Sequence, residues 1–428
     1  MPAQASPTRE GAGGDAASQG RLAWLDALRG IAVLFVVFDH LNLYVLPTLH
    51  QVIAPWFDAG KYGVMVFFLV SGYIVPASLE RKGSVRRFWV SRLFRLYPMW
   101  AVTILAALVL TGLGLSGLNG AAQHPAASTL AHMLMLQDVL GVDDAVSVLW
   151  TLSYEMVFYL LITCLFVVRA HRRNAGFAIG FAAAAVALGG MLPTQALSTG
   201  HSGIRVVAVS AAALVVAGLA AAVSGHRRFQ VAGGVLLGAT ALILVSFNSR
   251  TWVWESFAIL AWMFTGTTIY RAEHGDVSKK TAAVTAGLVL VLTVIGGVLH
   301  SYPWGVTPGI ATYLLAAATF AAGMVLWRRR APRFLAWTGL VSYSAYLLHP
   351  LLLPVFFTMP WISTITRAGP YGGALAVAFI ACLLACCWAS YRFVEAPAQR
   401  AGRWLGRWLD ARLGSDALPR NDGSRSAA

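Results

Sequence analysis

Charged residues are scarce in this chain. Asp, Glu, Lys and Arg make up 11% of its 428 residues, whereas hydrophobic residues make up 58% and the mean hydropathy is +0.68. Soluble domains usually contain about 25% charged residues, so the composition excludes an ordinary soluble protein. It predicts an integral membrane protein.

Cysteines and long polar segments are also few. The four cysteines, Cys164, Cys382, Cys386 and Cys387, all lie within apolar segments, which indicates packing roles rather than a disulfide framework. No predicted loop exceeds about 32 residues, which is too short for a soluble catalytic domain. Any chemistry must therefore take place between membrane helices. No internal repeat of regular period is found, which weakens the case for a transporter built from duplicated halves.

Apolar runs of membrane-spanning length are abundant. A bilayer core of about 30 Å requires roughly 17 to 25 apolar residues. We expect twelve transmembrane helices, at residues 27–46, 62–80, 96–116, 148–168, 175–193, 204–223, 230–246, 254–270, 281–299, 309–327, 336–356 and 372–391. Ten spans result if two Ala-rich runs, 175–193 and 204–223, form a hairpin that does not cross. The predicted fold is an all-α, polytopic transmembrane helix bundle.

The net charge of +15 reflects topology rather than a nucleic-acid partner. With the N-terminus inside, 28 of the 32 Lys and Arg residues fall in inner segments, and Lys61, Arg205, Arg250 and Arg367 lie outside. This asymmetry follows the positive-inside rule. We therefore expect a multi-pass protein of the cytoplasmic (plasma) membrane with both termini in the cytoplasm.

The two ends of the chain differ from the apolar middle. Residues 1–24, rich in Ala, Gly, Ser and Gln, predict a disordered cytoplasmic tail. Residues 25–397 form the predicted membrane domain. In 398–428, "QRAGRWLGRWLDARLG" places Trp and Leu against Arg at helical spacing. This pattern predicts an amphipathic helix on the membrane surface, followed by a disordered tail.

The first predicted span, "LRGIAVLFVVFDHL", contains two ionisable residues that lipid tolerates poorly. Arg29 and His40 are 11 residues apart, which leaves them about 20° from a shared helix face. Ionisable residues inside a membrane usually face a cavity or a partner and are functional candidates. The alternative is an arginine that extends to the interface and a histidine that packs through a hydrogen bond.

Glu155 and His349 lie on two other spans, at a predicted depth close to that of His40. A carboxylate beside an imidazole suits general base catalysis, because it orients the ring and stabilises its charged form. Metal binding by two histidines and a carboxylate is the alternative. We expect no metal, because no two of these residues share a helix at the spacing that preassembles ligands.

The segment "ERKGSVRRFWVSRLFRLYP" supplies six basic residues between the second and third spans. Arg92 and Arg95, three residues apart, fall on one helical face, with Arg87 nearby. Arginine pairs suit phosphate groups. The segment therefore predicts a polyphosphate ligand on the cytoplasmic side, with lipid headgroups as the alternative.

Six segments, taken together and in this order, resemble the membrane-bound acyltransferase-3 family of O-acyltransferases. They are "LDALRGIAVLFVVFDH", "VFFLVSGY" at 66–73, "RLFR" at 92–95 leading to Pro98, "LWTLSYEMVFY" at 149–159, "VSYSAYLLH" at 341–349 and "YRFVEAPAQR" at 391–400. The resemblance covers residues 25–160 and 335–400 well. Between them the chain matches in hydrophobicity alone.

The resemblance implies transfer of an acyl group, usually acetyl, from cytoplasmic acyl-CoA to a hydroxyl of a glycan or glycosylated small molecule. Acyl-CoA is then a co-substrate, and no cofactor is permanently bound. The implied roles are His40 as catalytic base or acyl carrier and Glu155, the motif glutamate, as the second catalytic residue. Arg29, Arg92 and Arg95 are the implied contacts of CoA, and Ser71, Tyr154 and His349 the implied substrate contacts. The alternative function is a secondary transporter with a His and Glu proton relay, which would move its substrate without consuming acyl-CoA.

Overall fold

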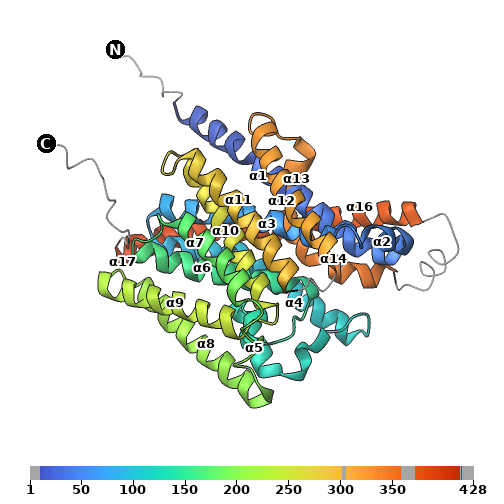
Figure 1. Ribbon diagram of the computed structural model, residues 1–428, viewed down its shortest axis with the longest axis horizontal. Coiled ribbons are helices and arrows are strands. Elements are labelled where there is room, and N and C mark those ends of the chain that lie inside the picture. Colours follow the sequence, from blue (N-terminus) through green and yellow to red (C-terminus); the bar gives the residue numbers. More distant parts are fainter. Residues whose placement is uncertain (1–9, 301–304, 358–371, 415, 417–428) are drawn as a thin grey trace, which may run out of the picture.

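The computed structural model describes residues 10–300, 305–357, 372–414 and 416 (Figure 1). This part of the chain forms helices and turns and contains no strand. The longer helices are α1 Glu10–Val45, α3 Ala59–Lys82, α4 Val85–Gly112, α6 Trp150–Val167, α7 Asn174–Leu188, α8 Gly200–Ala222, α9 Arg227–Phe247, α10 Val253–Glu273, α11 Lys279–Leu299, α12 Val306–Leu326, α14 Ser342–Phe357, α16 Gly372–Ser390 and α17 Ala396–Leu413. The shorter ones are α2 Pro47–Ile53, α5 Pro125–Leu134 and α13 Arg333–Leu340, with single turns η1 Asn119–Gln123, η2 Asp138–Leu140, η3 Ser147–Leu149 and η4 Tyr391–Glu395. The predicted all-α class is confirmed.

Nine helices of the described chain are long and apolar enough to cross a membrane, and α13 with α14, bent by 70°, forms a tenth if the pair counts as one span. Two of the twelve predicted spans lie on helices outside that set. The run 175–193 contains α7, which has 15 residues. The run 254–270 lies on α10, whose 21 residues are long enough but less apolar.

The polarity of α10 has a structural cause. Almost all of its residues are buried, including Glu255, Thr265 and Thr267, because α3, α7 and α11 pack around it. A helix surrounded by other helices does not need the apolar surface that lipid requires. Hydropathy therefore underrates the helix at the centre of the bundle.

The two chain ends differ in part from the sequence prediction. Helix α1 begins at Glu10 and so reaches into the segment 1–24 that was predicted to be a disordered tail, whose first nine residues lie outside the described chain. At the other end, α16 continues through the π-helical turn η4 into α17, which covers the predicted amphipathic segment. The start of α1 and the whole of α17 lie toward the same end of the bundle (Figure 1).

Helix α3 holds the bundle together, since it packs against α1, α10 and α12. Its crossing with α10 is very close at Gly72, where a Cβ atom would lie 1.9 Å from the carbonyl oxygen of Met263. The hydroxyl of Thr267 donates a hydrogen bond of 2.8 Å to the Gly72 carbonyl. This close crossing explains why glycine stands at position 72 of the segment "VFFLVSGY".

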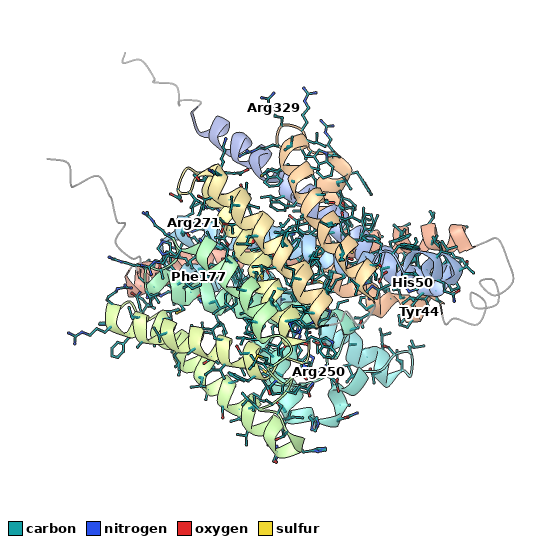
Figure 2. All side chains as sticks on the ribbon, in the orientation of Figure 1. Tyr44, His50, Phe177, Arg250, Arg271 and Arg329 are labelled. Atoms are coloured by element: carbon teal, nitrogen blue, oxygen red, sulfur yellow. The ribbon has the colours of Figure 1, made fainter. Side chains whose placement is uncertain are left out.

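The bundle has one end that is rich in basic residues. Arg271 and Arg329 lie toward the end where α17 is found, whereas Tyr44, His50 and Arg250 lie toward the other (Figure 2). We call the former the basic end and the latter the opposite end. Arg29 lies in the first third of Ala23–Val45, the apolar part of α1, and therefore nearer the basic end, and His40 lies about 16 Å further along the helix.

Candidate active site

A cavity lies between α1, α3, α4, α6 and α14 and contains about 730 Å³ of empty space, part of which is open to the surroundings. Five of the predicted site residues line it, namely Arg29, Ser71, Arg92, Arg95 and Glu155. Its lining on α3 extends from Val64 to Val75, a length of about 16 Å along the helix. The cavity thus covers about half of a bilayer core.

Two of the arginines in this cavity have no carboxylate partner. Within the described chain, no carboxylate oxygen lies within 4.0 Å of Arg92 or Arg95, although Arg92 is only 6% exposed. The Arg92 Nε atom is buried without a hydrogen-bond acceptor, and the guanidinium lies 5.4 Å from the ring centroid of Tyr159. A buried charge is costly unless it is paired. The arrangement is typical of an anion-binding site.

Arg29 differs from these two arginines, because Asp26 lies one turn before it on α1. The Arg29 Nη1 and Asp26 Oδ1 atoms are 3.8 Å apart, which is a long ion pair. Aspartate at this distance neutralises Arg29 in part, and the guanidinium still lines the cavity. Asp26 was not singled out by the sequence, since its place within "LDALRG" suggested no particular role.

Glu155 lies on the cavity wall and accepts a hydrogen bond from the Tyr159 hydroxyl one turn later in α6. In the part of the chain that the structure describes, no hydrogen bond or ion pair joins it to His40 or His349. The shared layer of three groups expected from the sequence is therefore divided. The carboxylate faces the arginines, and the imidazoles meet each other.

His40 of α1 and His349 of α14 form a pair, with ring centroids 5.0 Å apart. Each ring is fixed in the same way. The Nδ1 atom of His40 lies 2.9 Å from the Val36 carbonyl oxygen, and that of His349 lies 2.9 Å from the Ala345 carbonyl oxygen. Since a carbonyl can only accept, Nδ1 carries the proton and Nε2 keeps its lone pair. Both histidines are thus prepared to act as bases.

His349 is the more enclosed of the two. It is fully buried, and its Nε2 atom has no hydrogen-bond partner among the described residues. A buried polar atom without a partner is rare and costs free energy, so it indicates that a ligand group completes the site. His40, which is half-buried, is the more accessible ring.

Tyr346 connects the cavity to the histidine pair. It lines the cavity, its ring packs 5.7 Å from that of Phe67, and its centroid lies 6.1 Å from that of His349. Its hydroxyl oxygen accepts a hydrogen bond of 3.1 Å from Thr151. The inner end of the cavity is therefore one aromatic side chain away from the two imidazoles. In the sequence, the spacing of three between Tyr346 and His349 could have revealed this shared face.

Tyr154 was predicted as a substrate contact, but its side chain points away from the cavity. It is fully buried, and its hydroxyl lies 2.9 Å from Asp138, 2.6 Å from Ser249 and 2.8 Å from Ser256. Burial raises the pKa of Asp138, which lies in the turn η2. The network ties α6 to the segment before α10. Consecutive residues of a helix diverge by about 100°, which is why Tyr154 and Glu155 have different surroundings.

The described residues contain no group of three or more His, Cys, Asp or Glu side chains that could hold a metal ion. Among the described residues no salt bridge joins either histidine to a carboxylate, and Glu395, a motif residue, accepts a hydrogen bond from Ser344. The chemistry that this arrangement offers consists of anion binding by arginines and proton transfer by imidazoles.

Several known proteins are similar to parts of this chain. Nodulation protein 10 of Rhizobium leguminosarum bv. viciae is 27% identical over 249 residues, which cover 53% of this chain and 63% of the relative. A candidate peptidoglycan O-acetyltransferase of Bacillus subtilis is 30% identical over 152 residues, 32% of this chain and 22% of the relative. A candidate O-acetyltransferase of Staphylococcus aureus is 27% identical over 197 residues, 42% of this chain and 30% of the relative. The matched segments thus span less than two thirds of each relative, and no solved structure matches.

A model of the acyltransferase-3 family, described as an acyltransferase domain, matches residues 22–392. The match includes the two helices that carry the histidines, the helix that carries Arg92 and Arg95, and the helix that carries Glu155. It covers most of the chain, and it includes the Ala-rich middle where the sequence motifs are weak. The chain belongs to the acyltransferase-3 family.

Proposed function

We propose that this protein is a membrane O-acyltransferase that moves an acyl group, most simply acetyl, from acyl-CoA to a hydroxyl of a carbohydrate-type acceptor. One observation carries the proposal. The cavity contains Arg92 and Arg95, which have no carboxylate partner in the part of the chain that the structure describes, and it ends at Tyr346, next to the His40 and His349 pair. An anionic carrier can enter at one end while the reaction takes place at the other.

The donor fits the charge and the length of the cavity. CoA has a phosphate-rich head and a long, thin arm that ends in the thioester. In the proposal, Arg92, Arg95 and Arg29 bind the phosphates, since arginine is well suited to phosphate oxygens. The arm then extends along α3, past Ser71, toward Phe67 and Tyr346. A length of about 16 Å brings the thioester close to the histidines.

In the proposed reaction the Nε2 atom of His40 removes the proton from the acceptor hydroxyl. The oxygen attacks the thioester carbonyl carbon, the new C–O bond forms and the C–S bond breaks. CoA leaves as the thiolate and takes up the proton from the His40 imidazolium. In the alternative route the Nε2 atom of His40 attacks the thioester carbonyl carbon, the C–N bond forms, the C–S bond breaks and CoA leaves as the thiolate. The acceptor oxygen then attacks the acyl carbon, the C–O bond forms, the C–N bond breaks, and the hydroxyl proton passes to the thiolate. In both routes the Nδ1–H bond to the Val36 carbonyl keeps the ring oriented.

The other site residues have supporting roles in this proposal. The lone pair of His349 Nε2, which has no partner in the described chain, accepts a hydrogen bond from a second hydroxyl of the acceptor. Glu155, held by Tyr159, balances the charge of the arginines on the cavity wall. Neighbouring hydroxyls are typical of sugars, so this position favours a carbohydrate. The relative named for peptidoglycan O-acetylation supports the same class of acceptor.

We place the basic end on the cytoplasmic side of the plasma membrane. The donor that the family resemblance implies is cytoplasmic acyl-CoA. In addition, the excess of Lys and Arg at the basic end follows the positive-inside rule. The orientation is tested with single cysteines at exposed Arg81 and Ser147, in a variant without the natural cysteines. A membrane-impermeant reagent should label Ser147→Cys in intact cells and leave Arg81→Cys unlabelled. Labelling of Arg81→Cys would reverse the assigned orientation.

The function itself is tested with the purified protein in liposomes, supplied with radiolabelled acetyl-CoA and candidate glycans. We expect ester formation on the acceptor in equal amount to the free CoA released. Movement of a substrate across the liposome membrane without release of CoA would instead identify a transporter and overturn the proposal.

A further inference from the structure

A second and larger cavity lies on the other side of α3, between α10, α11 and α12. It contains about 1900 Å³ of empty space, part of which is open to the surroundings. Its walls are mostly apolar, whereas its mouth contains Glu273, Lys279, Arg328 and Arg329. We call it the α10–α12 cleft. It shares no lining residue with the candidate active site.

The three helices line the cleft over similar lengths. The lining extends from Trp262 to Glu273 on α10, from Lys279 to Leu290 on α11, and from Ala317 to Leu326, the last residue of α12, with Arg328 and Arg329 next to it at the mouth. The ranges on α10 and α11 each cover 11 helical steps, or about 16 Å, and the range on α12 covers 9 steps, or about 14 Å. This is about half of a bilayer core of about 30 Å. The cleft is therefore as deep as one leaflet.

Trp262 closes the cleft at its inner end. Its indole Nε1 atom donates a hydrogen bond of 3.2 Å to Thr293 of α11, and its ring lies 5.4 Å from that of Tyr313 of α12. These contacts join the three helices beyond the cleft.

Small residues keep the cleft open. Ala282, Ala286, Gly287 and Ala321 line it, and a Cβ atom added at Gly287 would meet no atom within 4 Å. Apolar side chains of ordinary size at these positions would fill the space. A mostly apolar space as deep as one leaflet suits acyl chains, and its depth fits those of a single lipid.

The charged residues at the mouth of the cleft indicate which class of lipid binds there. Glu273 is already engaged, because one of its oxygens lies 3.1 Å from Arg328 and accepts a hydrogen bond from Tyr73. Lys279, Arg328 and Arg329 are exposed, and together with Glu273 they leave two positive charges in excess. Phosphate is the group that best complements them. A headgroup without net charge leaves this excess uncompensated.

We infer that the α10–α12 cleft binds one anionic phospholipid from the leaflet at the basic end, with its acyl chains against Trp262 and its phosphate at Lys279, Arg328 and Arg329. The binding requires no acyl transfer and is independent of the proposed function. The lipid would fill the gap between α11 and α12 and hold them against α10.

The test uses the full-length protein in nanodiscs that contain equal amounts of phosphatidylglycerol and phosphatidylcholine, with retained lipids identified by native mass spectrometry. Basic residues near a membrane surface contribute roughly fivefold each to the binding of anionic lipid. The wild type should therefore retain one phosphatidylglycerol, and Arg328→Gln with Arg329→Gln should reduce this retention by roughly 25-fold. The matched control is Arg403→Gln with Arg407→Gln, which removes two charges from α17 and should leave the retention unchanged.

Two further experiments distinguish the proposed anionic phospholipid from other possible occupants of the cleft. Gly287→Trp, or Ala283→Leu if the tryptophan variant fails to fold, should block the cleft and reduce retention of every lipid. Soluble glycerol phosphate should not displace the lipid, because it lacks acyl chains. Equal retention of phosphatidylcholine, equal loss in the α17 control, or displacement by glycerol phosphate would overturn the inference.

Discussion

Two pairs of arginines on α4 have the same charge and opposite surroundings. Arg86 lies 3.6 Å from Asp410 and donates hydrogen bonds to Asp416, Gly414 and Val223, while Arg87 also pairs with Asp410. Arg92 and Arg95, two turns further along, have no carboxylate partner among the described residues and face a cavity. The first pair attaches α17 to α4. The second pair is available for a ligand.

The comparison shows that the number of charges does not locate a site in a membrane protein. The positive-inside rule gathers basic residues at one side for topological reasons, so most of them are not functional. An arginine that is buried without a carboxylate is different, because its cost must be offset by something else. The predictions that follow test this distinction.

The largest effect is expected at the inner end of the cavity, where the imidazoles lie. His40→Ala should reduce the rate of ester formation by about 10²- to 10⁴-fold, which is the usual contribution of a positioned base. His40→Gln should be equally inactive, because an amide can form hydrogen bonds but cannot accept the proton. The assay measures labelled ester from acetyl-CoA and acceptor. Near-normal turnover of His40→Gln would return His40 to a packing role.

The next largest effect is expected for Arg92 and Arg95, which have no carboxylate partner among the described residues. Arg92→Gln with Arg95→Gln should raise the KM for acyl-CoA by roughly ten- to a hundredfold for each lost contact to a charged group. The kcat value should change less, because phosphate contacts are shared by the ground and transition states. Steady-state kinetics with varied acyl-CoA measure both. A lost kcat with an unchanged KM would refute the assignment of these arginines to the donor.

A smaller effect is expected for the second imidazole. His349→Gln should retain partial activity, with a loss of about tenfold or less, because one hydrogen bond to the acceptor contributes about 0.5–1.5 kcal/mol. The KM for the acceptor should rise, and the KM for acyl-CoA should stay the same. A complete loss in a variant that remains folded would instead assign proton transfer to His349.

The smallest effect is expected for the paired arginines. Arg87 is 47% exposed, and its ion pair with Asp410 should contribute about 0.2–1 kcal/mol to stability. Arg87→Gln should therefore lower the melting temperature slightly and leave the KM for acyl-CoA unchanged. Thermal unfolding in detergent and steady-state kinetics measure the two values. A raised KM in this variant would remove the contrast between the two pairs.

Much of the site could be predicted because it depends on positions along single helices. Helical spacing placed Arg29 and His40 on one face of the first predicted span, and it placed Arg92 and Arg95 on one face of another helix. The structure brings Arg29, Arg92 and Arg95 to one cavity with Ser71 and Glu155. The all-α class followed in the same way from apolar runs of spanning length.

The remaining features depend on contacts between helices, which the sequence does not reveal. Glu155 and His40 have similar predicted depths, but depth does not determine which way a side chain points, and Glu155 bonds to Tyr159 instead. The same reason explains Tyr154, two of whose hydrogen-bond partners, Ser249 and Ser256, lie 95 and 102 residues away in the chain. The polar residues of α10 could not be recognised as signs of a helix in the interior of the bundle before its neighbouring helices were known.

The most direct test of the account is equilibrium binding of CoA to three purified variants. The account predicts that His40→Gln binds CoA as tightly as the wild type, because it alters the site of transfer and leaves the arginines intact. Arg92→Gln with Arg95→Gln should lose most of this affinity, whereas Arg86→Gln with Arg87→Gln should keep it. Equal affinity of the two double variants for CoA would contradict the central claim that Arg92 and Arg95, which have no carboxylate partner among the described residues, form the donor site.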